Sequence, residues 1–497
     1  MAKENIINTI KSFSGQFWIL NFLQMIEKLA YWIVLLQMPV YIAQKDAAGG
    51  LMWGQATKGV IFFWWAAVQN LSPLIFGSWA DRYGRKRLLF ISFIIIISGY
   101  ILLGNFRDFY PFVAATILLG LGSGMFKPAL QGAIAAKLNE KNSSTGWGIY
   151  FMLLNLAVFF GPAVSKYLKE ISWEMVFWGS AMIFALNFLV LMFFRESKNT
   201  PRHSDDNRES KIFSHSFIRE TKGEKQDHTN TLKSKAVLAN LFKPRVIWFI
   251  LIMSGFMTIY MQFYETLPNF LIDWTDTTFL VDSLNLPDFL LMETKRGLMI
   301  SYEWLYTLNS IMIIAFVVII SRVFGRIDRM KAIALGIVLS TFGLVLSGVS
   351  MIGIMTICGI IIYTFGEMIT NPKFTEHLGS IATKDSKSMY LSYLNISLAF
   401  GLGFGSLLGG YFYGKFGEKA TLAMDYLNRK YDINSEISIS KAMEVLCEKT
   451  GMSSAQATEM LWREYDPYLV WLPFLIIGIA SVAGIWFYLK RFSRIKE

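Results

Sequence analysis

The sequence predicts an all-α membrane protein with 12 transmembrane helices in two pseudo-symmetric six-helix bundles. Of the 497 residues, 54% are hydrophobic and only 17% are charged, and apolar segments recur along the chain. Their length, about 20 residues, is what a helix needs to cross a bilayer. Because lipid offers no partner for backbone polar groups, such segments must be helices, since the alternating pattern of a membrane barrel is absent.

The apolar runs fall into two sets of six. The first set lies near residues 17–43, 57–80, 87–105, 109–137, 145–168 and 173–194. The second set lies near 244–272, 300–323, 330–350, 352–378, 388–414 and 467–490. We therefore expect an N-terminal bundle over 1–194, a polar cytoplasmic linker over 195–243, and a C-terminal bundle over 244–497 with an extracytoplasmic insertion at 415–466. The first run carries charges and lacks a small-residue cleavage site, so it reads as a retained helix.

Positive charge marks one side of the predicted membrane. The net charge is +11, and Lys and Arg collect after the second and eighth runs, in the linker and in the tail. By the positive-inside rule both termini are cytoplasmic in a plasma membrane, so these charges are topology signals and no nucleic-acid partner is expected. Two cysteines exclude a disulfide framework or a metal cluster, and no phosphate-binding glycine loop is present. The expected partners are a small-molecule substrate and membrane lipid, and the chain is expected to be a monomer.

Two segments repeat at an offset of 240 residues. The matched pairs are Tyr150 and Tyr390, Asn155 and Asn395, Phe160 and Phe400, and Gly161 and Gly401. This register predicts duplicated halves that face each other across a central cavity. The same offset pairs Lys127 with Glu367, which places opposite charges on opposite walls. That arrangement suits a zwitterionic solute.

A polar stripe follows the first apolar run. Asn21, Gln24, Glu27, Lys28 and Tyr31 recur at helical spacing and so share one face. Facing lipid would cost about 2.5–3.5 kcal/mol for each charge, so the stripe must face the protein interior. We expect Glu27 to carry the coupling proton beside Lys28, with no cofactor other than protons. The alternative is a static salt bridge that ties this helix to a neighbour.

The segment GSWADRYGRKR follows the second apolar run. An acid that caps the next helix, with arginines near helix ends and lipid headgroups, gives this pattern a physical reason. The segment resembles the loop 2–3 signature of the major facilitator superfamily at Gly77, Asp81, Arg82, Gly84 and Arg85. The resemblance implies the major facilitator fold, alternating access, and a gating role for these five residues.

Five further segments resemble, in order, the proton-dependent oligopeptide transporter (POT) family. They are QMIEKLAYW, GMFKPALQG, IYFMLLNLAVFFGP, YEWLYTLNS and EMITNP. This sequence departs from the family at Gln24, where a glutamate is usual, at Lys28, where arginine is usual, and at Tyr306, where glutamine is usual. The resemblance implies a proton-driven symporter that imports peptides or related solutes, with the carboxylate bound at Lys127 and the amino group at Glu367.

The remaining candidates complete the expected site. Substrate-binding residues are Gln24, Tyr31, Asn155, Trp304, Tyr306 and Asn309, and Glu265 in YMQFYETLPN is a candidate extracellular gate. For Lys127 and Glu367 the alternative is helix-packing ion pairs, and the aromatic residues could serve packing alone. Two other functions stay open at this point. One is a proton-coupled antiporter for a drug or metabolite, and the other is a non-transporting membrane sensor or scaffold.

Overall fold

The computed structural model describes residues 10–45, 47–139, 142–195, 243–324, 327–381, 387–433 and 437–492. The linker predicted at 195–243 lies outside these residues except at its two ends. Among the described residues, eleven helices are long and apolar enough to cross a membrane, and a shorter apolar helix covers Tyr302–Val317. The helical membrane fold is confirmed, and the chain is a multi-pass integral membrane protein.

The N-terminal bundle begins with a capped helix and contains one break. Its helices are α2 (Gly15–Ala43), α3 (Gln55–Leu71), α4 (Pro73–Tyr83), α5 (Arg85–Asn105), α6 (Phe109–Ala135), α7 (Ser143–Ile171) and α8 (Trp173–Phe193). The Ser14 side chain accepts a hydrogen bond from the Phe17 N–H and so caps α2. The single helix predicted over 57–80 divides at Ser72, because Pro73 brings no N–H and fits best in a first turn.

The C-terminal bundle has a similar break. Its helices are α10 (Pro244–Glu265), α11 (Leu267–Asp273), α13 (Tyr302–Phe324), α14 (Arg329–Leu346), α15 (Gly353–Ile381), α16 (Lys387–Phe416) and α20 (Leu472–Phe492). The helix predicted over 244–272 ends at Glu265 and restarts at Leu267, with Pro268 in the first turn of α11. α14 and α15 approach closely at glycines, since a Cβ at Gly359 would lie 2.4 Å from the backbone N of Ser347.

Two smaller units lie at one end of the bundles. α12 (Thr278–Leu284) and η1 (Asp288–Leu290) precede an antiparallel hairpin of β1 (Leu291–Thr294) and β2 (Gly297–Ile300). The all-α prediction missed this hairpin, because four-residue strands carry too short a pattern to stand out beside long apolar runs. The segment predicted as an insertion holds α17 (Lys419–Tyr431), η2 (Ile439–Lys441), α18 (Ala442–Thr450) and α19 (Ser454–Tyr465), which we call the cap. η3 (Pro467–Trp471) leads from the cap into α20.

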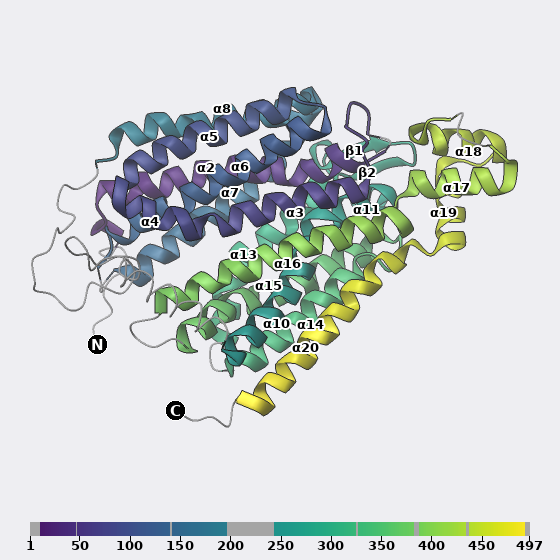
Figure 1. Cartoon of the computed structure of the whole chain (residues 1–497). Coiled ribbons are helices and arrows are strands. Elements are labelled where there is room, and N and C mark those ends of the chain that lie inside the picture. The colour runs from purple at the N-terminus through teal and green to yellow at the C-terminus, as the bar shows by residue number, and fades with distance from the viewer. Residues whose placement is uncertain are drawn as a thin grey trace, which may run out of the picture.

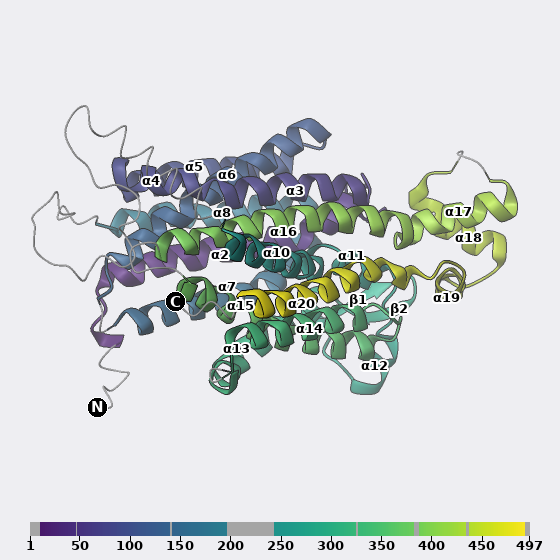
Figure 2. The ribbon, with the colours of Figure 1, turned by 60° about the horizontal axis from the view of Figure 1, so that its bottom comes forward.

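The two ends of the molecule differ. Figures 1 and 2 show the hairpin and the cap at one end, here called the hairpin end, and the start of α2 and the end of α20 at the other, the termini end. The bundles pack along α3 and α16, where a Cβ at Gly59 would lie 2.4 Å from the carbonyl oxygen of Ser406. The outer helices α8 and α20 diverge toward the termini end (Figure 1).

Candidate functional site

The N-terminal bundle holds a buried charged pair on α2. Gln24 is 3% exposed and Glu27 is 4% exposed, so the predicted polar stripe does face the interior. The Lys28 ammonium lies 3.1 Å from Glu27 Oε2 and 4.9 Å from the centre of the Tyr31 ring. Glu27 is therefore held by its neighbour on the same helix, an arrangement that a proton or a third charged group could change.

Lys127 on α6 adds a second cation to this cluster. It lies within electrostatic range of Lys28 and Glu27. Lys127 is the one charged residue of α6, and Pro128 follows it within the helix. Among the described residues Lys127 has no hydrogen-bond or ion-pair partner, so its ammonium is available for a ligand.

The C-terminal bundle presents a carboxylate of opposite sign. Glu367 on α15 is 6% exposed, and Asn309 on α13 donates to its Oε2 over 3.1 Å and to Thr364 Oγ1 over 2.9 Å. Tyr260 on α10 lies within electrostatic range of both Glu367 and Tyr31. Tyr260 is therefore within this range of one member of each charged cluster.

Aromatic rings connect the bundles beside these clusters. The Trp32 ring lies 4.9 Å from Tyr264, and Tyr264 lies 5.2 Å from Tyr260 and 6.4 Å from Tyr306. Tyr306 also donates its hydroxyl to the Phe263 carbonyl oxygen over 2.7 Å. Such rings can cover the side chain of a bound solute, and they also pack the two bundles together.

Two residues that were predicted to bind substrate form hydrogen bonds with the protein backbone. Asn155 donates to the Phe151 carbonyl of its own helix over 2.8 Å. Trp304 donates from its indole to the Phe289 carbonyl over 2.9 Å, and its ring lies 5.5 Å from the Phe289 ring. Trp304 therefore packs against the segment that precedes the hairpin.

The loop between α4 and α5 is set by a glycine. Gly84 has φ of +95°, a conformation that residues with a side chain rarely adopt, and it separates the two helices. The Arg82 guanidinium lies 5.5 Å from the Tyr83 ring, and a Cβ at Gly132 of α6 would lie 3.2 Å from Arg85 Nε. Gly77 and Asp81 lie within α4, and the Asp81 side chain lies outside the described residues.

Glu265, predicted as a gate, is fully buried where the bundles meet. Lys58 of α3, also fully buried, donates to the Glu265 carbonyl oxygen over 2.9 Å and lies in electrostatic range of the Glu265 and Glu418 carboxylates. Lys58 thus joins the N-terminal bundle to the end of α10 and to the start of the cap. The prediction did not include this lysine, although a cation early in an apolar run is a visible signal.

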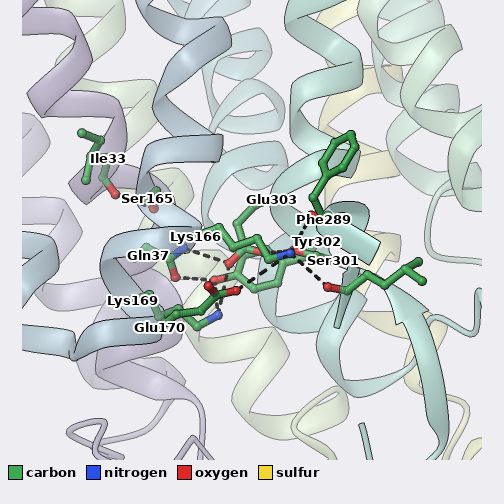
Figure 3. Close-up of polar contacts among 11 residues, drawn as sticks. Ile33, Gln37, Ser165, Lys166, Lys169, Glu170, Phe289, Ser301, Tyr302 and Glu303 are labelled. Atoms are coloured by element: carbon green, nitrogen blue, oxygen red, sulfur yellow. Dashed lines mark hydrogen bonds and ion pairs between the residues drawn. The ribbon is translucent and has the colours of Figure 1, made fainter. Parts of the chain in front are cut away.

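A second set of contacts between the bundles was not predicted from the sequence. Figure 3 shows Lys169 of α7 beside Glu303 and Tyr302 of α13, with Gln37 of α2 next to them. The Lys169 ammonium lies 3.1 Å from Glu303 Oε1, and Gln37 Nε2 donates to the same oxygen over 3.0 Å. Ser301 donates to the other Glu303 oxygen, and Tyr302 donates to Gln37 Oε1. We call Gln37, Lys169, Ser301, Tyr302 and Glu303 the gate cluster.

The gate cluster belongs to a closed end. Lys166 donates to the carbonyl oxygens of Phe289 (2.7 Å) and Leu291 (3.0 Å), and Asn269 donates to Gln44 over 3.0 Å. The hydrogen bonds that join the two bundles among the described residues gather at the hairpin end. The structure is therefore closed at this end. The described residues contain no group of three or more His, Cys, Asp or Glu placed to hold a metal ion.

The geometry defines a two-bundle membrane protein with charged residues between its halves, and the sequence comparison agrees. The family model for the Major Facilitator Superfamily matches residues 20–376. The chain belongs to the Major Facilitator Superfamily, a family of transporters rather than enzymes. The expected superfamily is thereby confirmed.

Curated relatives each match about a third of the chain. The class B tetracycline resistance protein of Escherichia coli is 29% identical over 174 residues, which is 33% of this chain and 39% of the relative. The class H tetracycline resistance protein of Pasteurella multocida is 26% identical over 150 residues, 30% of this chain and 36% of the relative. The quinolone resistance protein NorA of Staphylococcus aureus is 22% identical over 175 residues, which is 35% of this chain and 44% of the relative. The chain thus spans less than half the length of these relatives.

Solved structures match nearly the whole chain. A POT family transporter in complex with 5-aminolevulinic acid has a TM-score of 0.66 at 17% identity, covering 97% of this chain and 96% of its own. A bacterial homologue of the human lysosomal transporter Spinster, inward-facing and unoccupied, has a TM-score of 0.68 at 13% identity, covering 99% of each chain. At these identities the likeness shows the fold. It agrees with the predicted resemblance to the POT family.

Proposed function

We propose that the protein is a proton-coupled symporter that imports a small zwitterionic or anionic solute, such as a di- or tripeptide, by alternating access. The observation that carries this proposal is the pair of opposite charges on facing bundles, Lys127 on α6 and Glu367 on α15. Among the described residues, the Lys127 ammonium has no partner, which suits a solute carboxylate, and the Glu367 carboxylate is held only by amide donors, which suits an amino group. The solved structures with this fold include a POT family transporter in complex with a thioalcohol-conjugated peptide.

In this proposal Glu27 carries the proton. It is buried and its ammonium partner, Lys28, lies on the same helix, so a solute anion that draws Lys28 or Lys127 away leaves Glu27 ready to bind a proton. Proton and solute then favour each other's binding. One inward charge at 100 mV gives about 2.3 kcal/mol, enough for roughly fifty-fold accumulation.

The positive-inside rule gives the expected orientation of the protein in the membrane. The basic loop between α4 and α5 lies at the termini end, which becomes cytoplasmic, and the hairpin end becomes extracellular. The protein is then a plasma-membrane monomer surrounded by lipid. The closed hairpin end corresponds to the state that releases solute to the cytoplasm.

Uptake into proteoliposomes tests the proposal. Under an inward proton gradient, the native protein is expected to accumulate members of a mixed di- and tripeptide pool, read by mass spectrometry. Glu27→Gln should abolish gradient-driven accumulation and retain solute exchange, because solute binding survives while proton binding is lost. Glu170→Gln, which removes an exposed carboxylate from α7, is the matched control and should behave as native. Native-like accumulation by the Glu27→Gln protein would contradict the proposal.

A second candidate follows from the names of the curated relatives. These are tetracycline and quinolone resistance proteins, and they match about a third of the chain. A proton antiporter that exports a drug or metabolite could use the same Glu27. In the same vesicles, dissipation of the proton gradient by added tetracycline or a quinolone, without peptide accumulation, would favour this function.

A further inference from the structure

A groove lies between α5 and α8 on the surface of the N-terminal bundle. Its volume is about 400 Å³, within the range of sites for small organic molecules. Glu27, Lys127 and Glu367 do not line it, so the groove is separate from the charged residues of the proposed function. The lining residues are Ile97, Ile101 and Asn105 from α5, and Trp178, Ala181, Met182 and Ala185 from α8.

Small side chains on α8 produce this groove. The lining residues on α5 are four apart, and those on α8 are mostly three or four apart, so each set forms a row on one helix face. Within the α8 row, Ala181 and Ala185 contribute only methyl groups. At one end the helices approach closely, since a Cβ at Gly104 would lie 2.5 Å from Trp178 Nε1. The two helices therefore touch near Trp178 and leave a hollow beside the alanines.

The groove is continuous with the lipid-facing surface of the protein. α5 and α8 are packed neighbours on the outside of the bundle (Figure 1), and both are long and apolar enough to cross a membrane. Inside the groove Ile101 is 44% exposed and Met182 is 58% exposed. Ile94 and Leu189 extend the exposed apolar surface along the same helices. In a membrane, hydrocarbon covers such a surface, so the bilayer supplies the occupant of the groove.

One end of the groove is polar. Asn105 is the last residue of α5 and Trp178 lies in the second turn of α8, so both lie toward the hairpin end. Asn105 Nδ2 donates to the Ile101 carbonyl oxygen over 2.6 Å. Among the described residues the Trp178 indole N–H has no hydrogen-bond partner. Tryptophan at the boundary between hydrocarbon and water can donate to a lipid ester carbonyl, which accepts a hydrogen bond but cannot donate one.

The length of the groove corresponds to part of one leaflet. Ile97 precedes Asn105 by eight positions of α5, about 12 Å along the helix axis. One half of the hydrocarbon core is about 15 Å thick. A chain whose ester lies at Trp178 therefore runs toward Ile97 without leaving its own leaflet.

We propose that this groove binds one acyl chain of a phospholipid from the leaflet at the hairpin end, with its ester carbonyl accepting from the Trp178 indole. The chain fills the hollow beside Ala181 and Ala185 and so completes the packing of α5 against α8. The site does not depend on what the protein transports or in which direction, because none of its residues belongs to the charged clusters.

Native mass spectrometry of the purified full-length protein tests this site. The protein is delipidated in detergent and titrated with palmitoyl-oleoyl phosphatidylglycerol. We expect the first lipid to bind about tenfold more tightly than the lipids that follow. Dihexanoyl phosphatidylglycerol has the same headgroup and short chains, and should bind about tenfold more weakly because it buries less apolar surface. Equal affinity for the two lipids would mean that a headgroup site is responsible, and it would overturn the proposal.

A matched pair of variants locates the chain. Ala185→Trp fills the groove, whereas Leu186→Trp adds the same side chain at an exposed neighbour that does not line it. Ala185→Trp should weaken binding of the first lipid about tenfold, and Leu186→Trp should leave it unchanged. Ile97→Trp fills the groove from the facing helix and should match Ala185→Trp, so the test does not depend on the folding of one variant. Native affinity in both filling variants would show that the lipid binds elsewhere.

Trp178→Phe examines the polar end of the groove. It keeps an aromatic ring and removes the N–H, so it should weaken binding of the first lipid by about two- to tenfold. Unchanged binding in this variant would contradict the placement of the ester. A dimer in the native protein that disappears in Ala185→Trp would show that a second copy of the chain fills the groove, and the lipid proposal would fail. Peptide uptake enters none of these measurements, so the symport proposal stands or falls separately.

Discussion

At the scale of single residues, Glu303 shows how a buried carboxylate can connect two helix bundles. It is 2% exposed, and two of its donors, Lys169 and Gln37, come from the opposite bundle. Removing one partner of a buried pair leaves the other charge uncompensated. The gate cluster therefore stabilises the closed hairpin end for as long as both bundles contribute to it.

We expect Lys169→Gln to shift the protein toward a state that is open at the hairpin end. Loss of a charge-assisted hydrogen bond costs about 1.5–3 kcal/mol, which is roughly a 10- to 150-fold change in the equilibrium. Spin labels on exposed positions at this end, at Tyr110 of α6 and Phe279 of α12, would report a longer distance by pulsed electron resonance. The exchange Lys169→Glu with Glu303→Lys should restore the short distance.

Glu170→Gln serves as the control for this experiment. Glu170 lies on the same helix as Lys169 and is 57% exposed, and its ion pair at 3.9 Å is with Lys166 of its own helix. Its removal should leave the label distance as in the native protein. An unchanged distance in Lys169→Gln would show that the gate cluster does not determine the closed state.

At the scale of elements, α14 and α15 depend on glycine for their close approach. A Cβ at Gly343 would lie 2.2 Å from the backbone N of Tyr363, and one at Gly359 would lie 2.4 Å from that of Ser347. Backbone atoms cannot yield as a side-chain end can, so the helices would have to separate. Without a hydrophobic driving force between helices in lipid, such packing is a main source of their association.

Gly359→Ala is expected to destabilise the purified protein by about 1–3 kcal/mol, read as a lower unfolding temperature. Gly148→Ala on α7 is the control, because a Cβ there meets no atom within 4 Å. That control should be neutral or slightly stabilising, since alanine favours helix by up to about 1 kcal/mol over glycine. Equal unfolding temperatures for the two variants would argue against close packing of α14 and α15.

The elements also show what the sequence could and could not predict. Long apolar runs are a local signal, so the membrane helices and the buried face with Gln24 and Glu27 followed from pattern and the cost of burial alone. Glu303 contacts Lys169 and Gln37 across 134 and 266 residues, and no local pattern encodes such a pair. The breaks before Pro73 and Pro268 had a visible cause in proline, yet apolar character continues through both.

At the scale of the whole molecule, the two bundles carry unlike charges at matching positions of their fourth long helices. Lys127 comes from the fourth long helix of one bundle, and Glu367 comes from the matching helix of the other at an offset of 240 residues. If a pseudo-two-fold axis relates the two positions, exchanging their charges leaves the site chemically similar but reversed. A zwitterion could then bind in the opposite orientation.

This symmetry yields a test of the proposed solute chemistry. Lys127→Glu and Glu367→Lys alone should each lower peptide uptake by about tenfold or more, because each variant puts two like charges opposite a zwitterion. The double exchange should recover part of the uptake, with altered preference among peptides, since the aromatic rings around Tyr264 do not reverse with the charges. The measurement is uptake of the peptide pool under a fixed proton gradient, normalised to the amount of folded protein. No recovery in a double variant that folds as the native protein does would mean that the two residues stabilise their own bundles separately, and the solute would then need another pair of charges to hold it.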